Sequence, residues 1–475
     1  MPAKPTGNLH NGRVTQRGAI LIILLVLIVV GIAAILVNSL TSTAAKNARR
    51  QNTAAALAQA KAALIGYAIS YGDTHSNQVP GYLPCPDTDG SNGEGVSVLS
   101  CGAQDVSVIG RLPWSTLDLS TSRDGDGECL WYAVSGTYKY NPKTGLMNWD
   151  TNGQFTINAA DGSPLASQVV AVVIAPGAAI SGLSQNRAPD GSAPICGGNY
   201  TAANYLDAGT VNSVNFNNAD IASGNFIQGT SGGNINDQMA FITRQDIWNA
   251  VQKRSDFQST DPNINPLIKM TRQVALCLAN YGNNNSPWDN DSLPRPAPLT
   301  LGTNLLTDYY PDTNYDDSTG SYAGRVPYRV NNSQAASSNN ISSPYYLLQS
   351  NGANCPNPAN WAAVYPWWTN WKDHLFYEVS SAFRPSAYTH QSCGYCVSIN
   401  SSVDYAAVVI FAGPRLPARS QTRAAKNDIS QYLESINSSP FNGAMGYENY
   451  LTGTASPTFN DVLYCIDQNL NVAPC

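Results

Sequence analysis

Residues 130–135 read LWYAVS and residues 375–380 read LFYEVS, and these two versions of one apolar motif decide how the chain is divided. Further motifs recur around them in the same order. The matching pairs are GRLPW at 110–114 with GRVPY at 324–328, 169–176 with 406–414, SQNRA at 184–188 with SQTRA at 420–424, NYL at 204–206 with NYL at 449–451, and Asn236-Asp237 with Asn460-Asp461. These collinear matches predict two homologous units, at residues 72–255 and 265–475.

The fold class follows from the apolar motifs inside each unit. VVAVVIAP at 169–176 and YAAVVIFAG at 405–413 are short, rich in β-branched residues and closed by Pro or Gly. Such motifs are typical of buried strands. We therefore predict an α+β fold in which each unit packs a sheet against a helix. Two units also suit the length of 475 residues, because one core usually organises ~100–200.

Composition excludes one class of partner and indicates a compartment. Only 12% of the residues are charged and the net charge is -6. After residue 72 no dense run of Lys and Arg occurs, so nucleic acid is not predicted as a partner. The ten cysteines form an even set, which favours an oxidising compartment and export from the cytoplasm.

The N-terminal region is predicted to be one long helix. Residues 19–37, AILIILLVLIVVGIAAILV, are uninterruptedly apolar and approach the ~20 residues that span a bilayer. No proline occurs between Pro5 and Pro80, and alanine is abundant, so the helix should continue to about Tyr71. We expect a single membrane pass at 19–37 within a helix over 19–71, after a basic leader at 1–18. A secretory signal or plain signal anchor is the alternative.

Beyond the apolar run, the helix is predicted to pack on the first unit. Its apolar side chains recur at helical spacing, and they are Leu57, Leu64, Ile65, Ala68 and Ile69.

Gln16-Arg17-Gly18, followed by the apolar run from Ala19, resembles the leader of type IV prepilins and pseudopilins. The resemblance implies that a prepilin peptidase cuts after Gly18, that Ala19 becomes the N-terminus, and that other pilin or pseudopilin subunits are partners. It also implies an antiparallel sheet against the helix, and an inner-membrane protein with a periplasmic or cell-surface domain.

One departure from the pilin pattern bears on the place of the subunit. Ile23 stands where pilins usually carry a glutamate. A carboxylate in a bilayer costs ~2.5–3.5 kcal/mol on insertion scales, and pilins tolerate this cost because the carboxylate pairs with a neighbour's N-terminal ammonium. Ile23 cannot form that pair. We therefore expect a minor subunit, at the tip or at initiation, of a type IV pilus or type II secretion filament.

A surface adhesin or carbohydrate-binding protein is the rival function. The second unit carries a Trp-rich insertion that the first lacks, with Trp361, Trp367, Trp368 and Trp371. These rings could form an adhesive face or fill the core of the second unit. For an enzyme we find no nucleophile motif, phosphate loop or HExxH pair. Asp124, Asp126 and Glu128 read as a turn within RDGDGE, so no catalytic residue is predicted.

Two loops at matching places alternate oxygen-bearing side chains, as calcium loops do. Asx-rich turns without metal have the same pattern, so both interpretations stay open. The candidate calcium ligands are Asp87, Asp89, Ser91, Glu94, Asp312, Asn314 and Asp316.

Two cysteine pairs are predicted to form structural disulfides. Cys85 and Cys101 bracket a polar loop. Cys393 and Cys396 form a CxxC motif after His390, and a redox pair or a zinc site is the alternative there. The residues that follow continue as strand or loop, whereas redox pairs normally open a helix. A disulfide is therefore favoured.

Overall fold

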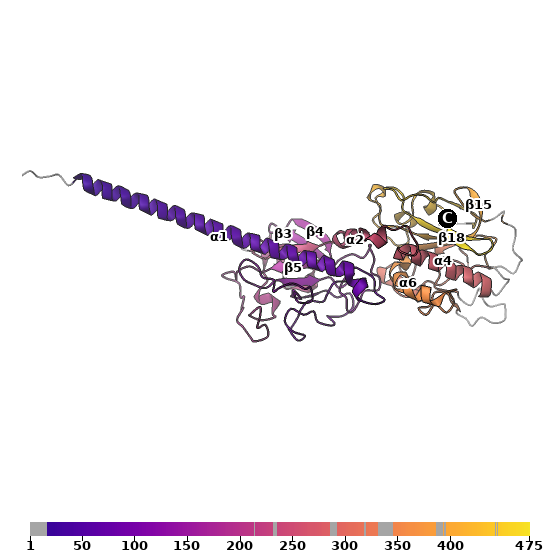
Figure 1. Cartoon of the computed structure of the whole chain (residues 1–475), viewed down its shortest axis with the longest axis horizontal. Coiled ribbons are helices and arrows are strands. Elements are labelled where there is room, and N and C mark those ends of the chain that lie inside the picture. Colours follow the sequence, from indigo (N-terminus) through magenta and orange to yellow (C-terminus); the bar gives the residue numbers. More distant parts are fainter. Residues whose placement is uncertain are drawn as a thin grey trace, which may run out of the picture.

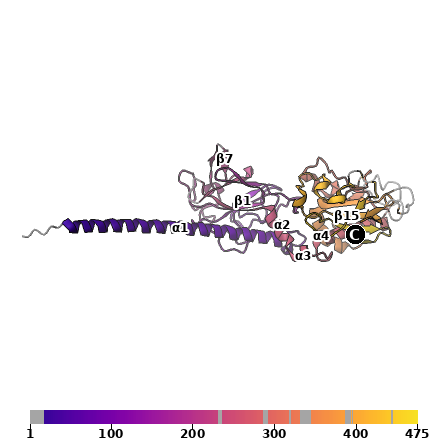
Figure 2. The same ribbon diagram turned by 90° about the horizontal axis from the view of Figure 1, so that it is seen from above.

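The computed structural model describes the chain except for residues 1–16, 213, 231–234, 286–291, 318–319, 331–344, 386–392, 394–395, 442 and 444; the side chains of 17–42, 214, 284–285 and 403–404 also lie outside the description. The chain is α+β and elongated. Figures 1 and 2 show helix α1 (Arg17–Thr74), a first unit along its C-terminal half, and a second unit beyond its end. We call residues 72–255 the first unit and 265–475 the second.

The first unit is built on a four-stranded antiparallel sheet in the order β1-β2-β5-β9. Every residue of β2 and β5 is buried, because both faces of the sheet are covered. Tyr132 and Val134 face the core that includes α1, and Trp131 and Ala133 face a second layer. The strands are β1 (Val108–Arg111), β2 (Trp131–Val134), β5 (Ala171–Ala175) and β9 (Gln238–Ile242), with the second layer β3 (Phe155–Ala159), β4 (Pro164–Val169) and β8 (Asn225–Gln228), and the hairpin β6 (Ala208–Val211) and β7 (Val214–Asn217).

The second unit contains a seven-stranded sheet whose central path β10-β13-β15-β17 has the same order and antiparallel directions as the first sheet. Three strands extend it, and β14 pairs with β16 in parallel. The strands are β10 (Ala323–Arg325), β13 (Leu375–Val379), β14 (Val397–Ile399), β15 (Ser402–Phe411), β16 (Asn449–Tyr450), β17 (Val462–Asp467) and β18 (Val472–Pro474), beside the small ladder of β11 (Arg329–Val330) and β12 (Tyr345–Tyr346).

Helices hold equivalent places on the two sheets. The C-terminal half of α1 packs on β5 and β9, and α4 (Pro266–Asn285) packs on β15 and β17. Leu57, Leu64 and Ala68 of α1 are buried, as the spacing predicts for the packed face. The connection contains α2 (Arg244–Gln252) and α3 (Ser255–Gln258), and α6 (Pro358–Trp371) packs on α4. The short 3-10 helices are η1 (Ala202–Asn204), η2 (Ile221–Ser223), η3 (Leu306–Tyr309), η4 (Asp312–Asn314), η5 (Lys372–His374), η7 (Pro417–Arg419), η8 (Ile429–Gln431) and η9 (Ser435–Ser438).

The expected membrane span requires a correction. Within the part of the chain that the structure describes, no helix has a stretch long and apolar enough to cross a membrane. From residue 43 onward α1 carries Lys46, Arg49, Arg50 and Lys61, and it uses its apolar side to pack on the first sheet. The predicted fold with a transmembrane helix at 19–37, and the inner-membrane localisation that rested on it, are therefore wrong on this finding.

Candidate functional site

The two units are joined by a segment of the first, residues 144–151, that inserts into the second. Gly145 lies against the ring of Tyr310, and a Cβ built on this glycine would lie 2.1 Å from the ring. Leu146 packs in a cluster with residues of the second unit, among them Tyr309 and Tyr315. The backbone N–H of Met147 donates to Asn370 Oδ1 at 2.7 Å. This segment therefore makes the junction a continuous packed interior.

The end of the inserted segment carries a buried charge across the junction. Asp150 Oδ1 accepts from Arg415 Nε at 2.6 Å, and Asp150 Oδ2 accepts from Arg423 Nη1 at 2.9 Å. His374 stands between two carboxylates, with Nε2 2.8 Å from Asp150 Oδ2 and Nδ1 2.9 Å from Asp373 Oδ1. Trp149 Nε1 lies 2.9 Å from His374 Nε2. Charged and aromatic groups of both units thus form one hydrogen-bonded cluster.

Electrostatics keep both carboxylates of this cluster ionised. Burial by itself raises the pKa of Asp150, but the charges of Arg423 and Arg415 and the contact with His374 outweigh it, so the pKa lies well below its ordinary value. The pKa of Asp373 is likewise lowered, because Lys426 and His374 outweigh its burial. Removing one partner of such a buried carboxylate would leave an uncompensated charge in the junction, which is strongly destabilising.

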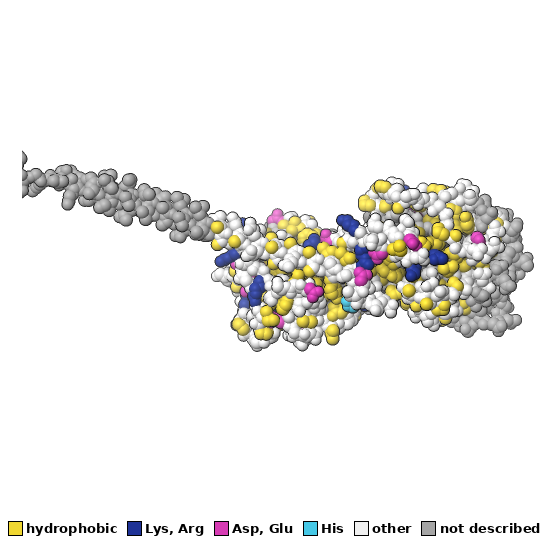
Figure 3. Space-filling model, viewed as in Figure 1, with side chains coloured by type: hydrophobic (Ala, Val, Ile, Leu, Met, Phe, Trp, Pro, Cys, Tyr) yellow, Lys and Arg dark blue, Asp and Glu magenta, His cyan; other side chains and the backbone are white. Residues whose placement is uncertain are grey.

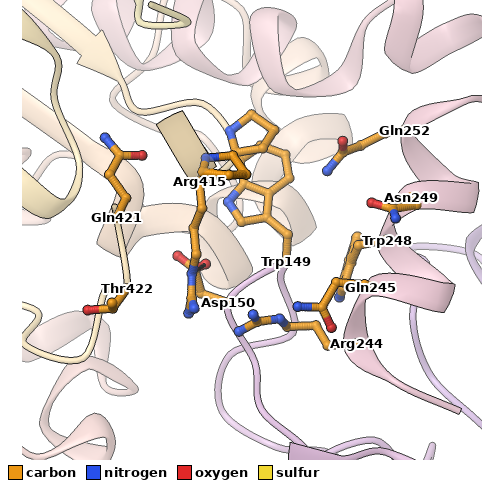
Figure 4. A pocket seen from close by; sticks show the side chains of 12 residues that line it. Trp149, Asp150, Arg244, Gln245, Trp248, Asn249, Gln252, Arg415, Gln421 and Thr422 are labelled. Atoms are coloured by element: carbon orange, nitrogen blue, oxygen red, sulfur yellow. Dashed lines mark hydrogen bonds and ion pairs between the residues drawn. The ribbon is translucent and has the colours of Figure 1, made fainter. Parts of the chain in front are cut away.

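A cavity of ≈ 400 Å³ opens beside the junction cluster. Figure 4 shows Gln245, Asn249 and Gln252 of α2 on one side and Gln421 and Thr422 on the other. Trp149, Asp150 and Arg415 lie between them (Figure 4). A second cavity of ≈ 570 Å³ shares Trp149, Gln252 and Pro414 with the first, and Phe257, Leu267 and Phe411 make its walls more apolar. The junction is therefore hollowed on this side, and the space-filling view shows the surface narrowing between the two units (Figure 3).

Each unit also contains a buried pair of acidic side chains with the same surroundings. In the first unit, the N–H groups of Asp207 and Asp237 each donate to the other's carboxylate, at 2.7 and 3.1 Å. In the second unit, Glu434 N donates to Asp461 Oδ2 at 3.1 Å. The partners correspond one to one: Gln185 and Gln421, Arg187 and Arg423, Asn218 and Asn437, Asn236 and Asn460, Tyr205 and Tyr432.

Sequence reasoning missed this pairing because it aligned one motif wrongly. The sequence matches NYL at 204–206 with NYL at 449–451. In the structure, however, the segment equivalent to Tyr205-Leu206-Asp207 is Tyr432-Leu433-Glu434, which has the corresponding partners in the second unit. Burial raises the pKa of Asp237 well above its ordinary value, and the nearby Asp207 adds to the shift. The pKa of Asp461 is raised for the same reasons, with Glu434 as its neighbour. The YLD and YLE motifs were the available signal.

The proposed calcium ligands point to protein donors. Asp87 accepts from the N–H groups of Gly90 and Gly95 and from the Tyr200 hydroxyl. Asp89 accepts from Ser91 N, and Glu94 accepts from the N–H groups of Ile195 and Cys196. Asp312 accepts from Tyr365 and Lys372, Asp316 pairs with Arg329, and Asn314 donates to Asp308. Within the described ranges no three His, Cys, Asp or Glu side chains come together as metal ligands. In the described ranges the acidic side chains of each loop are thus held by donors of the protein and are not gathered into one group.

The tryptophans of the insertion do not form a surface. Trp361, Trp368 and Trp371 are fully buried, and Trp367 is partly buried against Phe257. Trp371 also contacts Trp149 and Trp248 of the first unit edge-on, at 5.8 and 5.6 Å between ring centroids. Trp361, Trp368 and Trp371 therefore cannot form an adhesive face, because buried rings cannot stack on a ligand. They fill the core and the junction.

Other predicted site residues have structural surroundings. Cys85 pairs with Cys101 and Cys393 pairs with Cys396, while His390 lies outside the described residues. Further disulfides are Cys129–Cys196, Cys277–Cys355 and Cys465–Cys475. Gly18 and Ala19 lie in the first turn of α1, where side chains are outside the description.

The acidic side chains of RDGDGE form a turn against α1. The Asp124 carboxylate accepts from the N–H groups of Asp126 and Glu128. Asp126 pairs with Arg49 and Glu128 with Arg187. These acids therefore hold the turn and its neighbours, and their partners are cations of the protein itself.

The comparisons with known proteins add no relative. No family matches the chain, and no curated protein or solved structure is significantly similar to it.

Proposed function

We propose that this chain is a structural subunit of an extracytoplasmic filament of the type IV pilus or type II secretion kind, and that it acts in assembly. One observation carries the proposal. Helix α1 is 58 residues long, and Figures 1 and 2 show its N-terminal half extending away from the rest of the described chain. Thr43 to Asn52 of this helix are exposed, and burial begins at Thr53. A helix presented in this way is suited to contacts with other subunits.

The physical reason for assembly lies in the apolar run. Residues 19–37 are entirely apolar in sequence, and a helix that is apolar all round has to be buried. In a filament, the same helices of neighbouring subunits bury one another. Each unit contains disulfides of its own. Disulfides are typical of proteins that function in an oxidising compartment.

The proposed position is the tip or the initiating complex. Ile23 has no carboxylate to pair with the N-terminal ammonium of an earlier subunit, and the first subunit of a filament needs no such pair. The second unit lies in line with α1, beyond its C-terminal end (Figure 1). In a shaft, this volume would compete with the next subunit. At the tip it would not.

Labelling of sheared filaments tests the proposal. Antibody against the second unit should mark one end of each filament, and the chain in that fraction should begin at Ala19. A Gly18→Val variant should keep its leader, while the control Gly31→Val, in the same apolar run, should be processed normally. Uniform labelling of the shaft would overturn the tip position. Absence of the chain from the filament fraction would overturn the subunit role.

A further inference from the structure

The cavity beside the junction carries more positive than negative charge. Two guanidinium groups, those of Arg244 and Arg415, line the cavity beside one carboxylate, that of Asp150, which the buried Arg423 also neutralises. Arg244 donates to the neutral Asn152 Oδ1 at 2.7 Å. Among the residues described, no carboxylate lies within ion-pair distance of it. An anion in the cavity would therefore relieve a repulsion that the protein leaves in place.

Both lining arginines keep N–H groups available. Arg415 uses Nε for Asp150, and Arg244 uses Nη1 for Asn152. The other guanidinium nitrogens of these two residues have no partner among the described residues, and none of them is a buried, unsatisfied atom. They are therefore at least partly exposed, and both side chains line the cavity. A guanidinium group with two free N–H groups suits a carboxylate, which it can bind in bidentate geometry.

A row of uncommitted amides continues the same wall. Gln245, Asn249 and Gln252 follow one another at helical spacing along α2, and all three line the cavity (Figure 4). Gln245 and Asn249 are exposed, and in the described chain the side-chain amides of all three lack a protein partner. Gln421, on the opposite wall, is instead committed to Glu434 and to Leu416 N. Each free amide can donate to one hydroxyl and accept from another.

We propose that this cavity binds a small sugar acid, with the carboxylate between Arg244 and Arg415 and the hydroxyl groups along the α2 amides. Trp149 and Trp248 also line the cavity (Figure 4), but both are buried, so recognition would rest on the arginines and the amides. The volume of ≈ 400 Å³ lies at the lower end of the range for small-ligand sites, ~300–1,000 Å³. Inorganic phosphate would satisfy the arginines but leave the amide row unused. This binding is independent of filament assembly.

Titration of the full-length chain with glucuronate tests the site by calorimetry. We expect saturable binding, with glucose at least about ten-fold weaker because a charge-assisted pair is lost. Arg244→Gln should weaken glucuronate about ten-fold or more, and Asn249→Ala about three-fold or more. The matched control is Arg419→Gln, an exposed arginine of η7 outside the cavity lining. It should bind like the wild type.

The outcomes separate the possible ligands. Asn249 is exposed, so Asn249→Ala keeps the test valid even if Arg244→Gln fails to fold. No glucuronate binding at about 10 mM, well above the ~1 mM that corresponds to −4.1 kcal/mol, would overturn the proposal. Glucose binding as tightly, or phosphate binding more tightly, would overturn the sugar-acid assignment. Equal losses in Arg419→Gln and Arg244→Gln would show attraction by net charge and overturn the site.

Discussion

Asp150 of the first unit and Arg423 of the second form an ion pair with 2.9 Å between Oδ2 and Nη1, and their side chains are only 4% and 0% exposed. The pair lies at the junction, so it connects the stability of one unit to that of the other. Neither charge can be hydrated if its partner is removed, and an unpaired buried charge is costly. The two units should therefore unfold together.

Asp150→Ala is expected to lower the free energy of unfolding by about 3–5 kcal/mol, because Arg423 and Arg415 lose their shared carboxylate. Denaturant unfolding without reductant, followed by tryptophan fluorescence, measures the change. The control is Asp126→Ala, whose partner Arg49 is 61% exposed. It should cost less than about 1 kcal/mol. Equal losses in both variants would show that the junction pair has no special role.

Gly145→Ala tests the packing of the inserted segment. The new Cβ would lie 2.1 Å from the Tyr310 ring, so the segment or the ring has to move. We expect a loss of about 1–3 kcal/mol. Tyr310→Ala should remove most of the additional cost, which makes the double variant less destabilised than the sum of the two single variants. Gly66→Ala is the control, because nothing lies within 4 Å of its Cβ position on exposed α1. Strict additivity would contradict the contact.

The buried acid pairs should make stability fall as pH rises. The pKa values of Asp237 and Asp461 are raised by burial and by the neighbouring carboxylate. Such a group stabilises the fold below its unfolded pKa, ~3.9, and this contribution is lost as pH rises through the folded pKa. Asp237→Asn copies the protonated form. Its stability relative to the wild type, from urea unfolding at several pH values, should therefore increase from about pH 4 to pH 8.

Asp150→Asn provides the opposite sign in the same measurement. The pKa of Asp150 is lowered, by partner charges that outweigh burial. Its contribution is present above ~3.9 and is lost as pH falls through the folded pKa. The deficit of Asp150→Asn should therefore be largest at neutral pH and shrink in acid. A pH-independent difference for both variants would refute the assigned shifts.

Disulfides of different span should contribute differently. Cys277–Cys355 closes 78 residues and joins α4 to the segment before α6, whereas Cys85–Cys101 closes 16. In the loop-entropy model, the longer loop stabilises by about 1 kcal/mol more. Replacing Cys277 and Cys355 together by Ala should therefore lower the melting temperature more than replacing Cys85 and Cys101. The reverse order in calorimetry would show that native packing, and not chain entropy, decides the effect.

Local pattern was sufficient for the strands and for the packed end of the long helix. The apolar motif at 169–176 contains β5, and 406–414 contains most of β15, because short β-branched runs are buried wherever the sheet lies. The helix predicted to reach Tyr71 ends at Thr74. Alternating and helical spacing of apolar residues predict which side chains of a strand or helix are buried. Both patterns can be recognised in the sequence without knowing which element packs against them.

Other features were beyond local pattern. Apolarity at 19–37 indicated that a helix needs burial, but it could not say what buries it, and the membrane interpretation was wrong on the described chain. A cluster of tryptophans such as that of α6 looks the same in the sequence whether it fills a core or forms an adhesive face. Only their neighbours, such as Trp149 and Trp248, show that they are internal. Oxygen-rich loops likewise look alike whether they bind calcium or the protein's own N–H groups.

The amino-acid sequence by itself determined the repeated motifs, the α+β character, the places of the central strands and the pairing of nearby cysteines, because these depend on residues close in the chain. Tertiary structure alone decided that Asp150 enters the second unit, where it meets Arg415 and Arg423 more than 260 residues later. It also decided that Asp207 meets Asp237. Such contacts depend on where distant segments come together, and the charge of a side chain does not encode the position of its partner.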